Sequence, residues 1–142
     1  MVRILVSDKL AAEGLEILQS AQDVEVNVKT GLKPEELCSI IGEYDGLIIR
    51  SDTKVTADVL SHAHRLRVVA RAGVGVDNVD VPAATRKGIV VMNTPDGNTI
   101  STAEQTMCLL LALPRHTANA CASLPAGKWD RSIYMGRQLF GK

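Results

Sequence analysis

Short aliphatic runs alternate with amphipathic segments along most of the chain. Five of the runs predict β-strands, which cover residues 3–7, 24–28, 46–50, 67–70 and 89–92. In one run, valine alternates with Glu25 and Asn27, which is the pattern of a half-exposed strand at the edge of a sheet. The middle run is apolar up to Arg50, which is typical of a strand covered on both faces.

The segments between the predicted strands carry helical patterns. Apolar side chains gather on one face over residues 10–20, and Pro34 stands where a second helix begins. Thr56 is expected to cap a third helix, and a short fourth helix contains Pro82 and ends near Gly88. This alternation with short connections predicts an α/β fold, a flavodoxin-like, doubly wound, parallel five-stranded sheet with helices on both sides.

The pattern changes after the last predicted strand. Residues 95–98 predict a turn, and residues 101–104 are typical of a capping box that begins a long helix. This helix is apolar nearly all round, so we expect it to be buried between layers or against another subunit. A weakly patterned tail follows over residues 116–142. The alternation of predicted strands and helices therefore stops at about residue 95.

Composition narrows the class of protein. The 142 residues include 16 basic and 16 acidic side chains, so the formal charge of zero gives no reason to expect nucleic acid or a membrane surface as a partner. The longest apolar run, residues 107–113, is far shorter than the roughly 20 residues that cross a bilayer. Cys38, Cys108 and Cys121 form no C-x-x-C pair, and we expect reduced, buried thiols in a cytoplasmic protein.

Polar and charged residues follow the predicted strands at their carboxyl ends. These ends share one edge of a parallel sheet, where ligands of such folds bind. Two arginines at this edge suit a ligand with two anionic groups, because each guanidinium holds a carboxylate or phosphate through two hydrogen bonds. A solvated surface charge or a structural ion pair is the alternative for each arginine. The residues at this edge are Ser7, Asp8, Arg50, Ser51, residues 71–75 and residues 93–98.

A glycine loop follows the fourth predicted strand. Gly73 and Gly75 match the first two glycines of the dinucleotide fingerprint G-x-G-x-x-G, but Asn78 occupies the third position. The next apolar run also ends without the acidic residue that would hold a ribose hydroxyl. A structural turn or a small-anion loop fits these residues better, with backbone N–H groups facing the anion.

Longer blocks of sequence carry a resemblance to a known family. The blocks are residues 46–51, 70–80, 83–95, Ser101 with residues 103–104, and residues 127–129. On these blocks the whole chain resembles the D-isomer-specific 2-hydroxyacid dehydrogenases. The resemblance implies two flavodoxin- or Rossmann-type domains with a cleft between them. Residues 1–95 would be the substrate-binding domain, and residues 96–142 would open the NAD-binding domain with a helix and a dimerisation arm.

The resemblance also implies roles for single residues. Arg50 and Ser51 would hold an acidic group of the substrate, and Arg71 would face its carboxylate. Val74 lies where relatives touch the cofactor. No residue here matches the family's catalytic His, Glu and Arg or its G-x-G-x-x-G loop, so we expect these later in a longer chain, and we predict no metal ligand. The implied substrate-binding positions are Arg50, Ser51, Arg71, Ala72, Gly73 and Asn98.

The reaction implied for the longer protein is oxidation of 3-phosphoglycerate to 3-phosphohydroxypyruvate by NAD, the first step of serine biosynthesis. This part alone is expected to be inactive, and residues 101–142 would join subunits of a homo-oligomer. Another D-2-hydroxy acid as substrate, a non-catalytic binding module and a phospho-receiver module are the alternatives. Against the receiver, Arg50 stands in place of the phosphoacceptor aspartate and Asn93 in place of the lysine.

Overall fold

The computed structural model describes residues 1–142, which form two compact units, Met1–Gly97 and Asn98–Lys142. No helix is long and apolar enough to cross a membrane. The strands of the first unit are β1 (Val2–Val6), β2 (Val24–Val28), β3 (Gly46–Ile49), β4 (Val68–Arg71) and β5 (Val90–Met92). Its α-helices are α1 (Ala12–Ser20), α2 (Pro34–Ile40), α3 (Ala57–His62) and α4 (Val81–Arg86).

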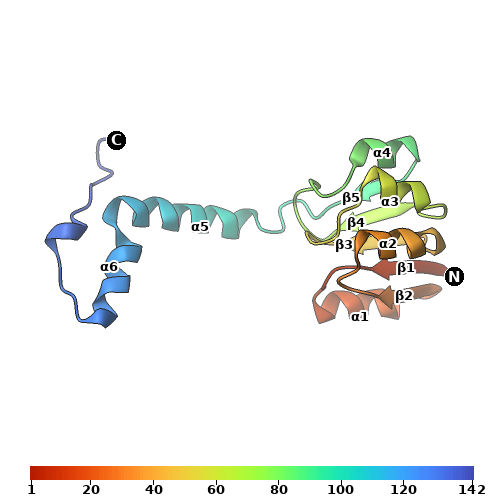
Figure 1. Ribbon diagram of the computed structural model, residues 1–142, viewed down its shortest axis with the longest axis horizontal. Helices are drawn as coiled ribbons and strands as arrows, with labels where there is room; N and C mark the ends of the chain where they lie inside the picture. The colour runs from red at the N-terminus through yellow and green to blue at the C-terminus, as the bar shows by residue number, and fades with distance from the viewer. The chain divides into compact units, whose positions relative to one another are not determined.

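The five strands form one sheet in the order β2-β1-β3-β4-β5, and every neighbouring pair is parallel. The predicted flavodoxin-like α/β fold is therefore confirmed, as is the edge position of β2 (Figure 1). Because all strands run the same way, their carboxyl ends meet at one edge, which also carries the loops into α3 and α4. We call this the carboxyl edge.

The two faces of the sheet are covered unequally. With right-handed crossovers, α1 lies on one face and α2, α3 and α4 lie on the other. The second face holds the core, in which Leu5, Leu47 and Val69 pack beneath these three helices. On the first face, apolar side chains of β1, β2 and β5 stay open to solvent. Val2, Val28, Val90 and Met92 are between 46% and 57% exposed.

Local sequence signals fix the helix ends of the first unit. Thr56 caps α3 as predicted, since its Oγ1 accepts a 3.3 Å hydrogen bond from the Val59 N–H. Asp80 caps α4 in the same way through the Ala83 N–H at 2.9 Å. Gly88 follows α4 with φ of 71°, a left-handed conformation that favours glycine.

The second unit contains α5 (Thr99–Ala112) and α6 (Thr117–Ser123). The predicted capping box at residues 101–104 is wrong, because α5 begins at Thr99 and Asn98 is its N-cap. Ser101 lies inside the helix, where its hydroxyl donates to the Asn98 carbonyl at 3.1 Å. The turn at residues 95–98 ends early enough for the helix to start there.

Neither α5 nor α6 buries a residue within this chain. The expectation that α5 is buried between layers or against another subunit is met by no contact within this chain and stays a prediction. The three thiols are free, as expected, but Cys108 and Cys121 are exposed rather than buried. They are exposed because they lie on these two uncovered helices.

Candidate functional site

Two loops lie side by side at the carboxyl edge. Residues 50–56 connect β3 to α3, and residues 72–80 connect β4 to α4. Val55 and Val79 form a parallel bridge between the loops. The Val55 N–H donates to the Asn78 carbonyl at 2.8 Å, and the Asp80 N–H donates to the Val55 carbonyl at 2.9 Å. The two loops therefore act as an extension of the sheet.

Asp8 holds the first loop from the side of β1. Asp8 is 4% exposed and lies two residues after the end of β1. It accepts hydrogen bonds from the Arg50 N–H at 2.6 Å and from the Thr53 N–H at 3.1 Å. The Thr53 hydroxyl donates a third bond at 2.5 Å. A buried carboxylate is stable only when it accepts such hydrogen bonds. These contacts therefore fix the backbone position of Arg50.

Asn78 holds the same loop from the opposite side. Its side-chain N–H groups donate to the carbonyls of Arg50 at 2.7 Å and Thr53 at 2.6 Å. Its Oδ1 is buried and accepts no hydrogen bond. Asn78 therefore ties the loop after β3 to the loop after β4. This is a reason for asparagine at the position where a dinucleotide fingerprint has glycine.

Arg71 lies folded against the glycine loop. Its side chain is 12% exposed, and its Nε lies 3.3 Å from the Arg50 carbonyl oxygen. Its Nη1 donates to the Gly75 carbonyl, and its Nη2 lies 3.5 Å from Asp77 Oδ1. Asp77 is 84% exposed, so this pair is screened by solvent and adds little stability. In this conformation Arg71 shapes the loop.

The backbone of the glycine loop is partly bonded within the chain. The Ala72 N–H donates to the Ile49 carbonyl at 2.8 Å, and the Gly73 N–H donates to the Arg71 carbonyl at 2.9 Å. The next two N–H groups, those of Val74 and Gly75, have no acceptor in the chain. These two donors are therefore free for an anion.

The remaining predicted residues take different positions. The exposed Arg50 guanidinium has no partner in the chain, and the Ser51 hydroxyl donates to Asp52 Oδ1 at 3.1 Å. Val74 is 41% exposed, and its carbonyl accepts a hydrogen bond from Asn93 Nδ2 at 2.7 Å. Asn98 belongs to the second unit as the N-cap of α5. The structure therefore brings Arg50, Ser51 and residues 71–74 to one edge of the first unit.

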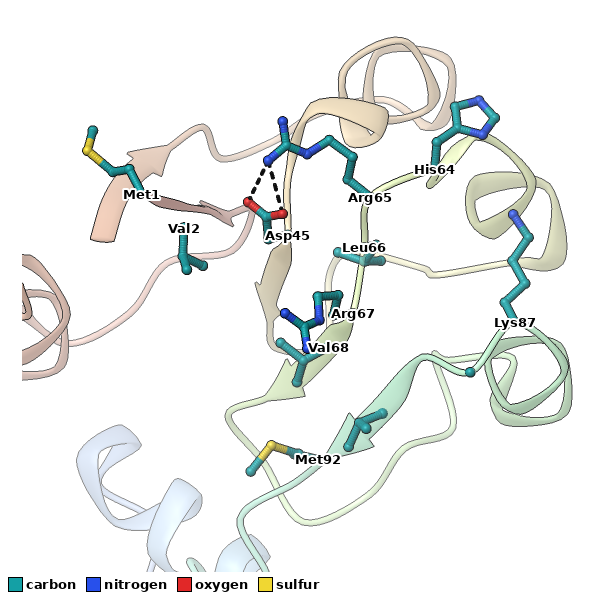
Figure 2. A pocket seen from close by; sticks show the side chains of 12 residues that line it. Met1, Val2, Asp45, His64, Arg65, Leu66, Arg67, Val68, Lys87 and Met92 are labelled. Carbon is teal, nitrogen blue, oxygen red and sulfur yellow. Dashed lines mark hydrogen bonds and ion pairs between the residues drawn. The ribbon is translucent and has the colours of Figure 1, made fainter. Parts of the chain in front are cut away.

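A separate hollow of about 680 Å³ opens at the amino ends of the strands (Figure 2). Arg65 reaches Asp45 across it, with Nη2 3.1 Å from Oδ1. The Arg3 N–H, which donates to Asp45, and the Arg65 guanidinium hold the pKa of the Asp45 carboxyl below its usual value. Lys87 donates to the Leu60 carbonyl at 2.5 Å. Asp45, Arg65 and Lys87 are therefore already bonded within the chain. For this reason we place the candidate site at the carboxyl edge.

The loop after β4 does not fit the pyrophosphate of a dinucleotide. In such a site a phosphate sits at the N-terminus of the following helix, but here the Asp80 carboxylate occupies the N-terminus of α4. The Asn78 side chain also fills the turn where the third glycine would lie. The residues at this edge can hold a small anion but do not form a cofactor site of their own.

Comparison with known proteins gives this edge a context. A sequence profile of the D-isomer specific 2-hydroxyacid dehydrogenase catalytic domain matches residues 4–129. The chain belongs to the D-isomer specific 2-hydroxyacid dehydrogenase family. Both the resemblance and the fold predicted from the sequence are thus confirmed.

Individual members of the dehydrogenase family match the whole chain. A D-3-phosphoglycerate dehydrogenase of Methanocaldococcus jannaschii is 52% identical over all 142 residues, which are 27% of its length. The rat enzyme of the same name is 51% identical over 140 residues, 99% of this chain and 26% of the relative. The chain thus spans about a quarter of the curated relatives it matches.

A solved structure supports the same placement in the family. NAD⁺-bound 3-phosphoglycerate dehydrogenase from Entamoeba histolytica superimposes with a TM-score of 0.74 and 28% identity. The match covers 97% of this chain and 43% of that one.

Sequence reasoning missed the roles of Asp8 and Asn78 as supports of the Arg50 loop. Asp8 carried a signal, because it directly follows the first predicted strand and therefore lies at the carboxyl edge. In the sequence, Asn78 shows only a departure from the dinucleotide pattern. Its contacts join loops that are far apart in the sequence, so the local pattern does not contain them.

Proposed function

We propose that this chain is the substrate-binding part of an NAD-dependent D-3-phosphoglycerate dehydrogenase. The longer protein would oxidise 3-phosphoglycerate to 3-phosphohydroxypyruvate, the entry step of serine biosynthesis. The observation that carries the proposal is the 52% identity to a D-3-phosphoglycerate dehydrogenase over all 142 residues. The match runs over the whole chain, so the aligned region includes the loops of the carboxyl edge as well as the core.

Arg50 is the residue that we assign to the phosphate or carboxylate of the substrate. Its exposed guanidinium has no partner in the chain, while its backbone is held by Asp8 and Asn78. Because the backbone is already fixed, only the side chain of Arg50 has to lose conformational entropy when an anion binds. Ser51 would add a hydroxyl donor next to it. Asn98 stays a predicted substrate contact of the second unit.

Arg71 and the glycine loop would receive the other anionic group. The free N–H groups of Val74 and Gly75 replace the donors predicted at Ala72 and Gly73, whose N–H groups are already bonded to the carbonyls of Ile49 and Arg71. Arg71 would contribute positive charge and hold the loop in shape. None of these groups transfers a proton in the proposal; they orient the substrate and balance its charge.

NAD would bind mainly to the part of the longer protein that this chain does not span. The Asp80 cap and the Asn78 side chain argue against a pyrophosphate site at the loop after β4. Val74, exposed near the tip of that loop, is the residue that we expect to touch the cofactor.

We further propose that residues 101–142 join two subunits. On α5, four apolar residues are between 50% and 58% exposed, and an apolar surface of this kind is typical of a protein interface. They are Met107, Leu109, Leu110 and Leu111.

The three free thiols support the proposal that the protein lies in a reducing compartment, the cytoplasm.

Titration of the labelled chain with 3-phosphoglycerate, followed by NMR, tests the substrate assignment. We expect amide shifts at residues 50–54 and 73–76. Arg50→Ala should weaken binding about tenfold or more, because a hydrogen-bonded charge contributes about 1.5–3 kcal/mol. Arg86→Ala removes another exposed arginine, on α4, and should leave binding unchanged. Shifts confined to other regions would refute the assignment.

Comparison of ligands separates the proposed substrate from its alternatives. D-glycerate lacks the phosphate and should bind more weakly than 3-phosphoglycerate. Equal binding of D-lactate or D-glycerate would favour a dehydrogenase for another D-2-hydroxy acid. The chain alone should not reduce NAD with 3-phosphoglycerate, and measurable turnover would show that these 142 residues contain catalytic groups.

A further inference from the structure

A cluster of three different metal-binding side chains lies between α2 and α3, which run side by side in Figure 1. Cys38 comes from α2, and Asp58 and His62 come from α3. One ligand atom from each residue lies within 4.8 Å of the other two. None of the three belongs to the carboxyl edge, and sequence analysis predicted no metal ligand there.

The spacing along α3 brings two of these side chains together. Asp58 and His62 are four residues apart, so they lie on the same face of the helix, one turn from each other. Packing of α2 against α3 adds the thiol, and Cys38 Sγ lies 3.6 Å from Asp58 Oδ2. The cluster is therefore a product of helix spacing and tertiary packing together.

The imidazole of His62 is already oriented by the backbone. Its Nδ1 lies 2.9 Å from the Asp58 carbonyl oxygen, which can only accept a hydrogen bond. The tautomer that satisfies this contact carries its proton on Nδ1 and leaves the lone pair of Nε2 free. Histidines that bind metals usually donate their other ring N–H to a carbonyl or carboxylate in this way.

We propose that Cys38, Asp58 and His62 form a binding site for a divalent cation of the zinc class. A thiolate, an imidazole and a carboxylate together suit Zn²⁺, which accepts sulfur, nitrogen and oxygen ligands. Bonds of about 2.0–2.3 Å place tetrahedral ligand atoms about 3.6 Å apart. Cys38 Sγ and Asp58 Oδ2 are already at this distance, and separations of up to 4.8 Å would have to shorten by about 1 Å or less. Water would complete the coordination.

Binding would deprotonate Cys38 and release its proton to solvent. Without a cation, burial and the nearby Asp58 carboxylate raise the pKa of the Cys38 thiol. A bound cation reverses this effect, because its charge stabilises the thiolate and neutralises the carboxylate. The metal would link α2 to α3 and stabilise the first unit. This inference does not depend on the proposed substrate.

Titration of the chain with Co²⁺ in a buffer free of thiols and chelators tests the site. We expect one equivalent to produce a sulfur-to-cobalt charge-transfer band in the near ultraviolet, and Zn²⁺ to displace it. Cys38→Ser should abolish the band. His62→Gln, at an exposed position, should weaken binding by about tenfold or more while the circular dichroism stays unchanged.

The other free thiols supply the control. Cys108→Ser removes an exposed thiol of α5 and should leave the band unchanged. Zn²⁺ should also raise the melting temperature of the unsubstituted chain but not that of Cys38→Ser. The inference is overturned if the unsubstituted chain gives no band, if the band survives Cys38→Ser, or if His62→Gln binds Co²⁺ as tightly as the unsubstituted chain.

Discussion

The backbone N–H of Arg50 donates a 2.6 Å hydrogen bond to the buried carboxylate of Asp8. The contact spans 42 positions of sequence and joins the ends of two neighbouring strands. Through it, a buried residue sets the backbone position of Arg50, whose side chain is exposed at the carboxyl edge. Residues that support the site can therefore be tested separately from residues that would touch a ligand.

Asp8→Asn should lower the free energy of unfolding by about 1–3 kcal/mol. The asparagine amide keeps one oxygen that can accept a hydrogen bond. Its N–H₂ group would face the N–H donors of the loop, which bond to the carboxylate in the unsubstituted chain. Urea unfolding of the chain measures the change. Asp52→Asn, at an exposed position in the same loop, should change stability by less than about 0.5 kcal/mol. Equal effects of the two substitutions would contradict the role given to Asp8.

Asn78→Asp should loosen both loops of the carboxyl edge. It removes two donors and places a carboxylate beside the carbonyl oxygens of Arg50 and Thr53, so we expect a loss of about 2 kcal/mol. Hydrogen exchange at the Val55 N–H, which is bonded to the Asn78 carbonyl, should accelerate. Asn119→Asp on α6 serves as the control. In this variant, hydrogen exchange at the Val55 N–H should be as slow as in the unsubstituted chain.

Gly75→Ala and Gly73→Ala should differ in effect. A Cβ on Gly75 would lie 2.9 Å from both Arg71 Nη1 and Asp77 Oδ1, so the guanidinium has to move. A Cβ on Gly73 would come no closer than 3.7 Å to Arg71, an ordinary contact. We expect Gly75→Ala to shift the Arg71 Nε NMR signal and to cost about 1 kcal/mol. A larger shift from Gly73→Ala would show that the loop adopts another conformation.

Asp45 should contribute stability that depends on pH. Its folded pKa is lowered, first by the hydrogen bond from the Arg3 N–H and then by Arg65. The contribution is therefore complete above the unfolded pKa of about 4 and is lost as the pH falls through the folded pKa. Asp45→Asn should reduce the unfolding free energy at pH 7, and the difference should shrink at pH 3. With the exposed Asp130→Asn, no such convergence is expected.

Leu110→Lys should weaken the proposed association of subunits. Burying an unpaired ammonium costs well over about 1.4 kcal/mol, so the dissociation constant should rise at least about tenfold. Sedimentation equilibrium at several concentrations measures it. Gln105→Lys adds the same charge at a polar position of α5 and should act less strongly. A chain that is monomeric at every concentration would refute association through α5.

The alternation of apolar runs and amphipathic segments was sufficient to predict the fold of residues 1–97. Each apolar run is local, and the Thr56 cap and Pro34 mark helix starts through contacts within a few residues. The sequence predicts the beginning of α5 too late, because Ser101 and Glu104 match a capping box while the preceding turn already lets the helix start at Thr99. A local signal fails where the neighbouring turn provides an earlier start.

By itself, the sequence determined which residues end the strands, and hence that Arg50 and the glycine loop share one edge of a parallel sheet. Only the tertiary structure decided which of these groups are already bonded within the chain. Arg71 is folded onto Gly75, whereas the Arg50 guanidinium is left without a partner. The reason is physical: strand periodicity is written in neighbouring residues, but hydrogen bonds from Asp8 and Asn78 depend on loops that meet only after the sheet has formed.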